Sequence, residues 1–370
     1  MYLSSINLRN IRKHTDTKID FAKKLNYIVG GNGVGKTTVL EAIYYLCTTK
    51  SCVTSSDAEA VKLGENGLSI QGYFTEATDN FVQINYSLTE NKKAYRLSDK
   101  QIFKFSDVIG KFPVVLLSPA DHSITQGFPA ERRKFVDSVI SQSSKTYLAN
   151  LIEYNKTLKH RTYLLNRLRE SNKKENRELE AWNEKLVISG AEIIEHRKNF
   201  VSEFEPYISS SYYEILSNRE KPKIKYYYLD GNCSGNLSEC FERRLEMLAE
   251  DEIRRGTNLV GPHRDDFIFE IDGLKLKHYG SQGQHKTFQT MLRFAEYFYL
   301  KDKTGTSPIF LLDDVFGELD AERAASISKH LSTVGQALIT LTDFGNISHL
   351  KVGEEDRVIK ISMDGSITYE

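Results

Sequence analysis

The sequence predicts an α/β protein in which a domain built on β-sheets is interrupted by an inserted helical lobe. Three observations support this prediction. Apolar and polar residues alternate as in strands over the first part of the chain, the middle carries two apolar helical stripes, and short apolar strands return later. With 370 residues, the chain is long enough for two domains, or for one large domain with an insertion, whose core needs neither disulfides nor metal.

The strand pattern of the first part begins close to the N-terminus. Apolar and polar residues alternate at 6–8 and again at 25–29, directly before a glycine-rich stretch. Further alternation over 71–88 predicts an antiparallel meander, and the apolar run FPVVLLSP is typical of a strand that is buried on both faces. We therefore expect residues 1–120 to form the first half of the sheet domain.

The middle of the chain carries a helical pattern. No proline occurs between Pro129 and Pro206, and apolar side chains recur at helical spacing over 151–168 and again over 179–200. The polar segment ESNKKENRE separates these stripes and is typical of a solvated connector. These features predict an inserted helical lobe over 121–224, in the form of an antiparallel helical hairpin too short to be a long coiled coil.

Strand signals return after the helical stretch. KIKYYYL is followed by DDFIFEIDGLKLKHY, which predicts a hairpin that turns at Asp272–Gly273. The runs SPIFLLDDV and GQALITLTD then predict two further buried strands with a helix between them. Residues 225–370 should therefore complete the sheet domain that residues 1–120 begin.

The composition excludes several classes of protein. Lysine plus arginine and aspartate plus glutamate both number 50, so a contact with nucleic acid would have to come from a local basic patch. The N-terminal residues form no apolar signal segment, and no apolar run is long enough to cross a bilayer, so we expect a cytoplasmic protein without a membrane partner. The cysteines show no CxxC pair or zinc spacing, which favours ordinary thiols in a reducing compartment for Cys47, Cys52, Cys233 and Cys240.

The stretch YIVGGNGVGKTTVLEAI matches the pattern of a phosphate-binding P-loop between a strand and a helix. Glycines let the backbone approach phosphate oxygens and adopt positive φ, and the amides of the helix N-terminus favour an anion. Lys36 should reach the β- and γ-phosphates of ATP, and Thr37 should bind Mg²⁺. The predicted ATP-binding loop comprises Gly30, Gly31, Asn32, Gly33, Val34, Gly35, Lys36, Thr37 and Thr38.

A P-loop site also needs a carboxylate from another strand, and PIFLLDDV supplies it. Four apolar residues lead to Asp313 and Asp314. Asp313 is expected to hold Mg²⁺ through water, and Asp314 is the expected catalytic residue that orients the attacking water. The alternative is a strand that ends in a solvated acidic turn.

A third motif narrows the class of ATPase. Ser281, Gly283 and Gln284 precede a helix predicted over 286–300, which makes a second anion-binding helix end. In ABC-type ATPases one subunit's Ser-x-Gly-Gln caps the ATP that another subunit's P-loop holds, and GELD, with Glu318 and Asp320, matches the D-loop that follows. We therefore predict an ABC-type ATPase head, a P-loop sheet with an antiparallel subdomain, around the inserted lobe. Taken alone, the tetrapeptide is equally compatible with a plain glycine turn.

These motifs, together with LRNIRKH, SPADHSITQGFPAERRKF and VGPHRDDF, resemble the RecF family of bacterial recombination-repair ATPases over nearly the whole chain. The resemblance implies ATP-driven homodimerisation on DNA, both duplex and single-strand/duplex junctions, in recombinational repair and replication restart. It implies weak, DNA-dependent ATP hydrolysis that acts as a release switch rather than as metabolic catalysis. It also implies work with RecR and RecO in loading RecA, a part in the SOS response, and a place at the nucleoid.

Two other functions stay open at this point. The chain could be another ABC/SMC-like head ATPase that acts on DNA, or a transport or metabolic P-loop ATPase. A small-molecule kinase would need an acceptor pocket and a lid, of which the sequence gives no sign, and a transporter subunit would lack the proline-free helical insertion. A head that binds DNA without hydrolysing ATP is disfavoured by the intact Lys36, Thr37, Asp313 and Asp314.

Basic residues of the insertion are the candidates for contact with DNA phosphates. The alternative is a solvated helix face that binds no DNA, since acidic residues are nearly as frequent as basic ones in the insertion. Arg9, Arg12 and Lys13 form a second candidate patch near the N-terminus. The predicted DNA contacts are Arg132, Arg133, Lys134, Lys159 and Arg161.

The segment GPHRDD also contains possible metal ligands, His263, Asp265 and Asp266. Adjacent residues of a strand point to opposite faces, so three ligands from this run would converge poorly. We therefore expect a structural or interface role for His263 and its neighbour Arg264.

Overall fold

The computed structural model divides into two compact units, which are described separately. Unit 1 consists of Met1–Asp121, Ser210–Arg219 and Thr290–Glu370, and unit 2 of His122–Ser209 and Glu220–Gln289. The residues that the structure describes are 1–76, 79–171, 177–216, 220–231, 233, 235–316, 321–342 and 353–370.

A mainly parallel sheet forms one half of unit 1. Its strand order is β15-β14-β3-β13-β12-β8, and every neighbouring pair is parallel except β14 with β15. All residues of β12 and β13 are buried, as their uninterrupted apolar sequences predict. The strands are β3 (Leu25–Val29), β8 (Val114–Leu117), β12 (Ile309–Leu312), β13 (Ala337–Leu341), β14 (Arg357–Ile361) and β15 (Ile367–Tyr369).

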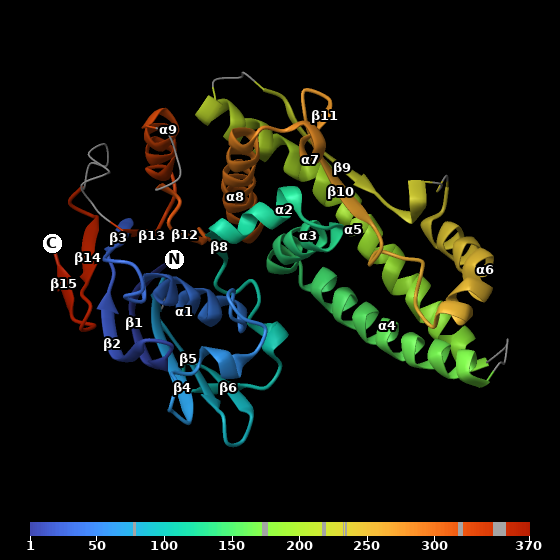
Figure 1. Ribbon diagram of the computed structural model, residues 1–370, viewed down its shortest axis with the longest axis horizontal. Coiled ribbons are helices and arrows are strands. Elements are labelled where there is room, and N and C mark those ends of the chain that lie inside the picture. Colours follow the sequence, from blue (N-terminus) through green and yellow to red (C-terminus); the bar gives the residue numbers. More distant parts are fainter. Residues whose placement is uncertain are drawn as a thin grey trace. The chain divides into compact units, whose positions relative to one another are not determined.

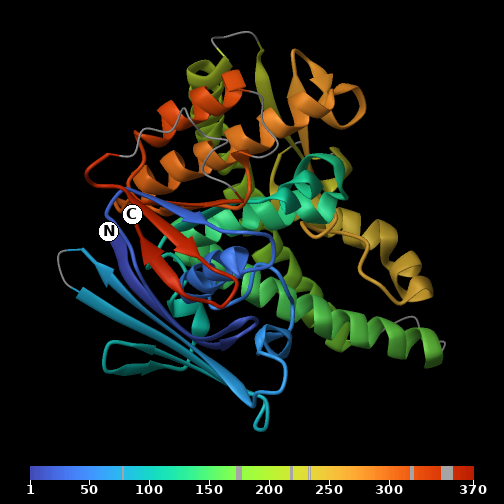
Figure 2. The same cartoon turned by 60° about the vertical axis from the view of Figure 1, so that its left-hand side comes forward.

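An antiparallel sheet forms the other half, drawn in blue and cyan in Figure 2, with the order β2-β1-β4-β5-β6-β7. The predicted meander over 71–88 is confirmed, because β4 and β5 pair antiparallel there. Alternate side chains of β4 and β5 are buried, which is the period expected of a sheet with one face on the core. The strands are β1 (Tyr2–Ile11), β2 (His14–Asp20), β4 (Gly67–Thr75), β5 (Asp79–Ser87), β6 (Lys92–Leu97) and β7 (Lys100–Ile102).

Helix α1 (Lys36–Thr48) packs against strands of both sheets, namely β1, β4 and β5 of the antiparallel sheet and β8 and β13 of the parallel one (Figure 1). Ten of its 13 residues are buried. A helix buried on nearly all sides is fixed in place by its packing, so its N-terminus is a rigid end. Unit 1 also holds η1 (Asp57–Ala60), η2 (Phe105–Asp107), η3 (Pro119–Asp121) and α9 (Ala321–Leu331).

Unit 2 is mainly helical, with a small sheet of order β11-β10-β9. Two of its helices, α5 and α8, continue into residues of unit 1. Its elements are α2 (His122–Gln126), α3 (Pro129–Ser143), α4 (Lys145–Ser171), α5 (Arg177–Leu216), β9 (Pro222–Tyr227), η4 (Leu229–Gly231), α6 (Leu237–Arg255), β10 (Asp266–Ile271), β11 (Leu274–Lys275), α7 (Leu276–Tyr279) and α8 (Gln282–Thr304).

The predicted antiparallel helical hairpin is formed by α4 and α5. Arg161 of α4 donates to Asn183 of α5 at 2.8 Å, and Tyr147 of α4 accepts from Arg197 of α5 at 3.2 Å. Since the earlier residue of α4 meets the later residue of α5, the two helices run in opposite directions, and Figure 1 shows them side by side in green and yellow-green.

The second predicted boundary differs from the structure. Residues 220–289 belong to unit 2 rather than to the sheet domain that was expected to resume at 225. The reason is packing: β10 lies on α3, and α6 lies on α4. Phe267 and Phe269 of β10 are buried within this unit. The predicted hairpin turn at Asp272–Gly273 is confirmed, because both residues have positive φ between β10 and β11.

The expectation of four ordinary thiols is wrong for two of them. Cys233 and Cys240 form a disulfide, with Cα atoms 5.5 Å apart. Cys240 lies in the first turns of α6, which Asn236 caps by accepting from the amides of Ser238 and Glu239. Cys47 is a buried free thiol, and Cys52 is an exposed one. Among the helices that the structure describes, none has the length and apolar character to cross a membrane.

Candidate nucleotide-binding site

The predicted P-loop connects β3 to α1 in unit 1, as the sequence indicates. Gly33 and Gly35 have φ of +77° and +106°, a backbone region that other residues rarely adopt. A Cβ at Gly35 would also lie 2.5 Å from Nε2 of His14, so both space and backbone require glycine there. The N-cap of α1 makes no side-chain hydrogen bond to the first helical amides. This leaves the helix end as an anion-binding site.

Lys36 is buried, and its ammonium stays close to the loop backbone. Nζ donates to the carbonyl oxygens of Gly30 at 2.7 Å and Gly31 at 2.9 Å. Burial lowers the pKa of Lys36, while the carboxylates of Asp314 and Asp313 act in the opposite direction. The lysine thus stabilises the loop shape and places a cation where phosphates would bind.

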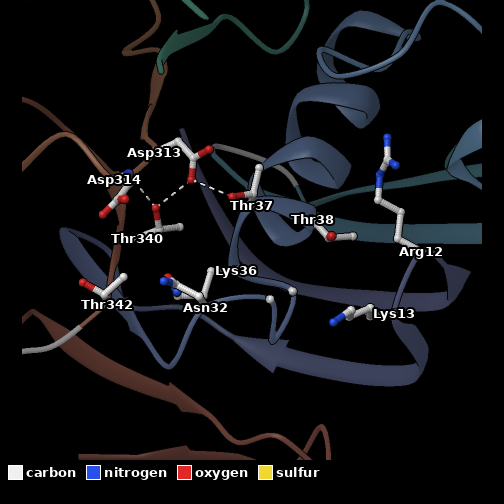
Figure 3. Close-up of a pocket in the computed structure, with 12 residues that line it drawn as sticks. Arg12, Lys13, Asn32, Lys36, Thr37, Thr38, Asp313, Asp314, Thr340 and Thr342 are labelled. Carbon is white, nitrogen blue, oxygen red and sulfur yellow. Dashed lines mark hydrogen bonds between the residues drawn. The ribbon is translucent and has the colours of Figure 1, made fainter. Parts of the chain in front are cut away.

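The carboxyl ends of the central strands bring the Mg²⁺ candidates together, as Figure 3 shows. Thr37 donates from Oγ1 to Oδ1 of Asp313 at 3.0 Å, and Thr340 donates to the same oxygen at 2.8 Å. The backbone amide of Asp314 donates to Thr340 Oγ1 at 2.9 Å, and Asp314 has a φ of +50°. A hydroxyl and a carboxylate at this distance are the hard oxygen ligands that Mg²⁺ prefers.

Thr340 was missed by the sequence analysis. It lies on β13, which is hydrogen-bonded between β3 and β12. Parallel neighbours end at one edge of a sheet, so a hydroxyl late in β13 had to fall between Thr37 and Asp313. The polar alternation in LITLTD was the available signal.

The site is a pocket of about 360 Å³, and two of its lining residues come from the turn between β1 and β2, which was not expected there. Arg12 and Lys13, assigned from sequence to a second DNA patch, line this pocket beside Asn32 and Thr342. Arg12 donates to the buried carboxylate of Glu41 on α1 at 2.9 Å, and this contact raises the arginine's pKa. The turn between β1 and β2 therefore brings Lys13 to the P-loop pocket, whereas the charge of Arg12 is compensated by Glu41.

His14 supports the loop from the same turn. Its Nε2 lies 3.1 Å from the Gly35 carbonyl oxygen, and its Nδ1 lies 3.0 Å from Thr17 Oγ1. Burial lowers the pKa of His14, so the neutral imidazole is favoured, with Nε2–H as donor to Gly35 and Nδ1 as acceptor from Thr17. The buried imidazole holds the last glycine of the loop.

The predicted Ser-x-Gly-Gln end lies in unit 2. Helix α8 begins at Gln282, earlier than predicted, so Gly283 and Gln284 occupy its first turn. The Gln284 amide donates to Ser281 Oγ at 3.2 Å, and the Ser281 amide donates to Gln284 Oε1 at 2.9 Å. This reciprocal pair is a capping box. The Gln284 side chain also donates to Glu220 at 2.9 Å.

One predicted feature falls on residues that are not described. The D-loop residues Glu318 and Asp320 lie outside the described part of the chain. Their roles therefore stay predictions.

Two residues that were predicted to contact DNA are buried and paired with carboxylates in the structure. Arg132 is 5% exposed and pairs with Asp266 at 2.7 Å, and Arg161 is 1% exposed and pairs with Glu252 at 2.8 Å. Guanidinium groups that are buried and paired inside the unit are not available to external phosphates. Arg133 is half-buried and donates to the Asp265 carbonyl at 2.6 Å. Of the five predicted contacts, only Lys134 and Lys159 are fully exposed.

The side chains of the GPHRDD segment go to separate partners, which supports a structural role. His263 Nδ1 lies 2.7 Å from the Tyr154 hydroxyl, and burial lowers its pKa to about 4. Arg264 donates to the Asn258 carbonyl at 2.7 Å. Burial raises the pKa of Asp265 to about 6, and its carboxylate accepts from the Tyr226 hydroxyl.

Comparisons of the sequence agree with this site. A family model described as an AAA domain matches residues 5–225. A protein named DNA replication and repair protein RecF, from Chloroherpeton thalassium, is 38% identical over 95% of this chain and 99% of its own length. A protein of the same name from Streptococcus pneumoniae is 33% identical over 99% of this chain and 98% of its own length.

Comparisons of the structure point the same way. A solved structure of the recombination mediator protein RecF with ATPrS, of the RecFOR pathway, matches with a TM-score of 0.90 and 32% identity over 100% of this chain and 98% of that one. An Smc head bound to the C-terminal winged-helix domain of ScpA matches with a TM-score of 0.58 and 13% identity over 100% and 97% of the chains, which shows the fold alone. The predicted fold class, an ABC-type ATPase head with an inserted lobe, is confirmed by these matches.

Proposed function

The chain belongs to the RecF family of DNA replication and repair proteins, and we propose that it is an ATP-dependent DNA-binding protein of recombinational repair and replication restart. The observation that carries the proposal is the contact between Thr37 and Asp313 beside the P-loop, which joins two distant motifs into one nucleotide site. Relatives solved with ATP and ATPrS support the choice of nucleotide.

ATP fits the residues present. The loop amides and Lys36 would hold its phosphates, and the pocket adds the positive charge of Lys13. Thr37 and Asp313 would hold Mg²⁺, which neutralises phosphate charge when bound. Asp314 would orient the attacking water. Its short side chain would place the water less well than a longer one, which supports slow hydrolysis. By family membership, this hydrolysis would depend on DNA and act as a release switch.

The nucleotide would control assembly rather than metabolism. Two molecules would each hold ATP at the P-loop, and each would cap its partner's ATP with Ser281, Gly283 and Gln284. Glu318 and Asp320 would line the contact between the two heads as D-loop residues. Closure on DNA and release after hydrolysis would then follow from the preference of ATP for the assembled state.

The partners follow from family membership. They would be DNA, as duplex or as single-strand/duplex junctions, with RecR and RecO as co-workers in loading RecA during the SOS response. A cytoplasmic place at the nucleoid fits this work. Among the residues first predicted to contact DNA, Arg133, Lys134 and Lys159 stay candidates.

The proposal is tested by sedimentation of the full chain with duplex DNA in the presence of ATP, of ADP and of no nucleotide. We expect dimers on DNA with ATP, and weaker or monomeric binding in the other two conditions. Equal DNA binding and equal mass in all three conditions would contradict a nucleotide switch.

A further inference from the structure

The helices of unit 2 differ sharply in charge. α4 carries six lysines and arginines against two glutamates, whereas α5 carries four against eight acidic residues and α6 four against six. No excess of positive charge remains when these helices are counted together, because opposite charges cancel. Of the three helices, only α4 has a positive excess.

Four of the six basic residues of α4 lie on its outward face. Their spacing of three, four and multiples of the helical repeat keeps them on one side, opposite the buried Tyr154 and Leu165. The face extends over about 33 Å at 1.5 Å per residue. We call it the α4 outer face: Lys145, Lys156, Lys159, Tyr163 and Arg167, all exposed.

These side chains are not engaged within the described part of the chain. No ion pair of Lys145, Lys156, Lys159 or Arg167 occurs among the described residues, in contrast to the buried and paired Arg161 of the same helix. Tyr163 is 68% exposed. Basic side chains that are exposed and unpaired along one line are available for an extended anion.

The neighbouring helices expose the opposite charge. α4 packs against α6, and α4 contacts α5 through Arg161 and Asn183. A polyanion lying along α4 would be repelled by the helices beside it, which restricts its path to the α4 outer face. The exposed acidic residues are Glu178, Glu180, Glu184, Glu192 and Glu195 on α5 and Glu239, Glu242, Glu246 and Glu250 on α6.

We propose that the α4 outer face binds the phosphate backbone of duplex DNA without reading its bases. This rests on the proposed function and locates its DNA contact. Surfaces for single strands stack successive bases on several aromatic rings, whereas the α4 outer face offers only Tyr163. The nearby His160 ring is stacked on Trp182 at 4.5 Å and 8°, so it is already covered. Lysine, arginine and tyrosine contacts to phosphates fit a backbone-binding face.

The test uses the full chain with three charges reversed, K156E/K159E/R167E. Its matched control, K92E/K100E/K104E, makes the same change in net charge at exposed lysines of unit 1. Binding of a labelled duplex of about 30 base pairs, longer than the helix, is measured with ATP across about 50–200 mM salt. The chain's single tryptophan, Trp182, gives a second signal beside α4 through its fluorescence.

Loss of three phosphate contacts should weaken binding on the order of 100-fold near 150 mM salt and reduce the slope of log K against log salt by about 2.7. The control should bind like the wild type, and ATP binding should be unchanged in both variants. The neutral variant K156Q/K159Q/R167Q should bind DNA with an affinity between those of the wild type and K156E/K159E/R167E. It shows whether the loss of binding comes from charge rather than from a folding defect.

Three results would overturn the inference. Wild-type affinity and salt slope in K156E/K159E/R167E would show that DNA lies elsewhere while the proposed function stands. Equal weakening by the control would show that only net charge matters. A wild-type chain that binds no duplex under any nucleotide would contradict both the inference and the proposed function.

Discussion

Two helix N-termini of this chain are suited to an anion, and they differ in how complete they are. The α1 end follows glycines with positive φ, has no side-chain cap, and carries the buried Lys36. The α8 end is already satisfied by its own Ser281 and Gln284. The first is an open phosphate site, and the second holds its donors in a capping box.

This difference teaches that the two ends cannot serve ATP in the same way. The α1 end is ready to bind phosphates, because no side-chain cap has to be displaced from its amides first. Ser281 has to leave its cap before its hydroxyl can meet a phosphate, which costs about 1 kcal/mol. We infer that the α8 end engages only when a nucleotide already held by another molecule's α1 end compensates for that loss.

The largest effect is expected from Lys36→Met, which removes the cation of the α1 end. Loss of a charged hydrogen-bonding group should weaken ATP binding by about 3 kcal/mol, or roughly 100-fold, and dimerisation and hydrolysis should fall with it. Titration calorimetry with ATP measures the affinity. An unchanged affinity would mean that the α1 end is not the nucleotide site.

Ser281→Arg should separate the two ends. With arginine in place of Ser281, the α8 end cannot cap a partner's ATP, so ATP-dependent dimers should disappear while ATP affinity stays within about twofold. Ser281→Ala is the control that removes only the cap, at about 1 kcal/mol of stability. A Ser281→Arg protein that still dimerises with ATP would contradict the role assigned to the α8 end.

Asp314→Asn should affect chemistry alone. Asparagine tolerates the φ of +50° at this position, so the backbone should be kept. ATP binding and dimerisation should persist, while hydrolysis by the dimer on DNA should fall about 100-fold, the lower end of the range for a residue that handles the attacking water. A steady-state phosphate-release assay on duplex DNA measures the rate, and an unchanged rate would remove Asp314 from the mechanism.

The smallest effect concerns His14, the support of the α1 end. Burial lowers its pKa, so the unfolded chain takes up a proton before the folded one does. Its contribution is therefore complete above the ordinary value of 6.5 and is lost as the pH falls below it. His14→Ala should lower the free energy of unfolding by about 1–2 kcal/mol at pH 8.

Thermal unfolding at pH 8 and pH 5.5 checks the sign. The difference in Tm between wild type and His14→Ala should shrink at the lower pH. A difference that grows on acidification would mean that the charged imidazole is the stabilising form.

The sequence predicts the α1 end well and its surroundings poorly. The loop, Thr37 and Asp313 were recognisable because short motifs at the carboxyl ends of parallel strands in one sheet meet at the same edge. The pocket role of Arg12 and Lys13 depends on how the β1–β2 turn folds against the loop, which no local pattern encodes.

The lobe shows the same limit. The sequence suggested that the basic side chains of Arg161 and Arg132 were exposed. In the structure they pair with acidic residues that follow 91 and 134 positions later. The charge of α4 was invisible in a count over the predicted insertion, 121–224, since the acidic residues of α5 cancel it. Burial and pairing between distant segments decide which charges face outward, and periodicity alone does not specify them.

The central claim is that one molecule's α1 end and another's α8 end complete a single ATP site. Sedimentation velocity on a mixture of Lys36→Met and Ser281→Arg proteins tests it most directly. Each alone should stay monomeric with ATP, but together they can form one intact site, from the P-loop of the second and Ser281 of the first. We predict ATP-dependent heterodimers in the mixture. A mixture that stays monomeric at concentrations where the wild type dimerises would contradict the account.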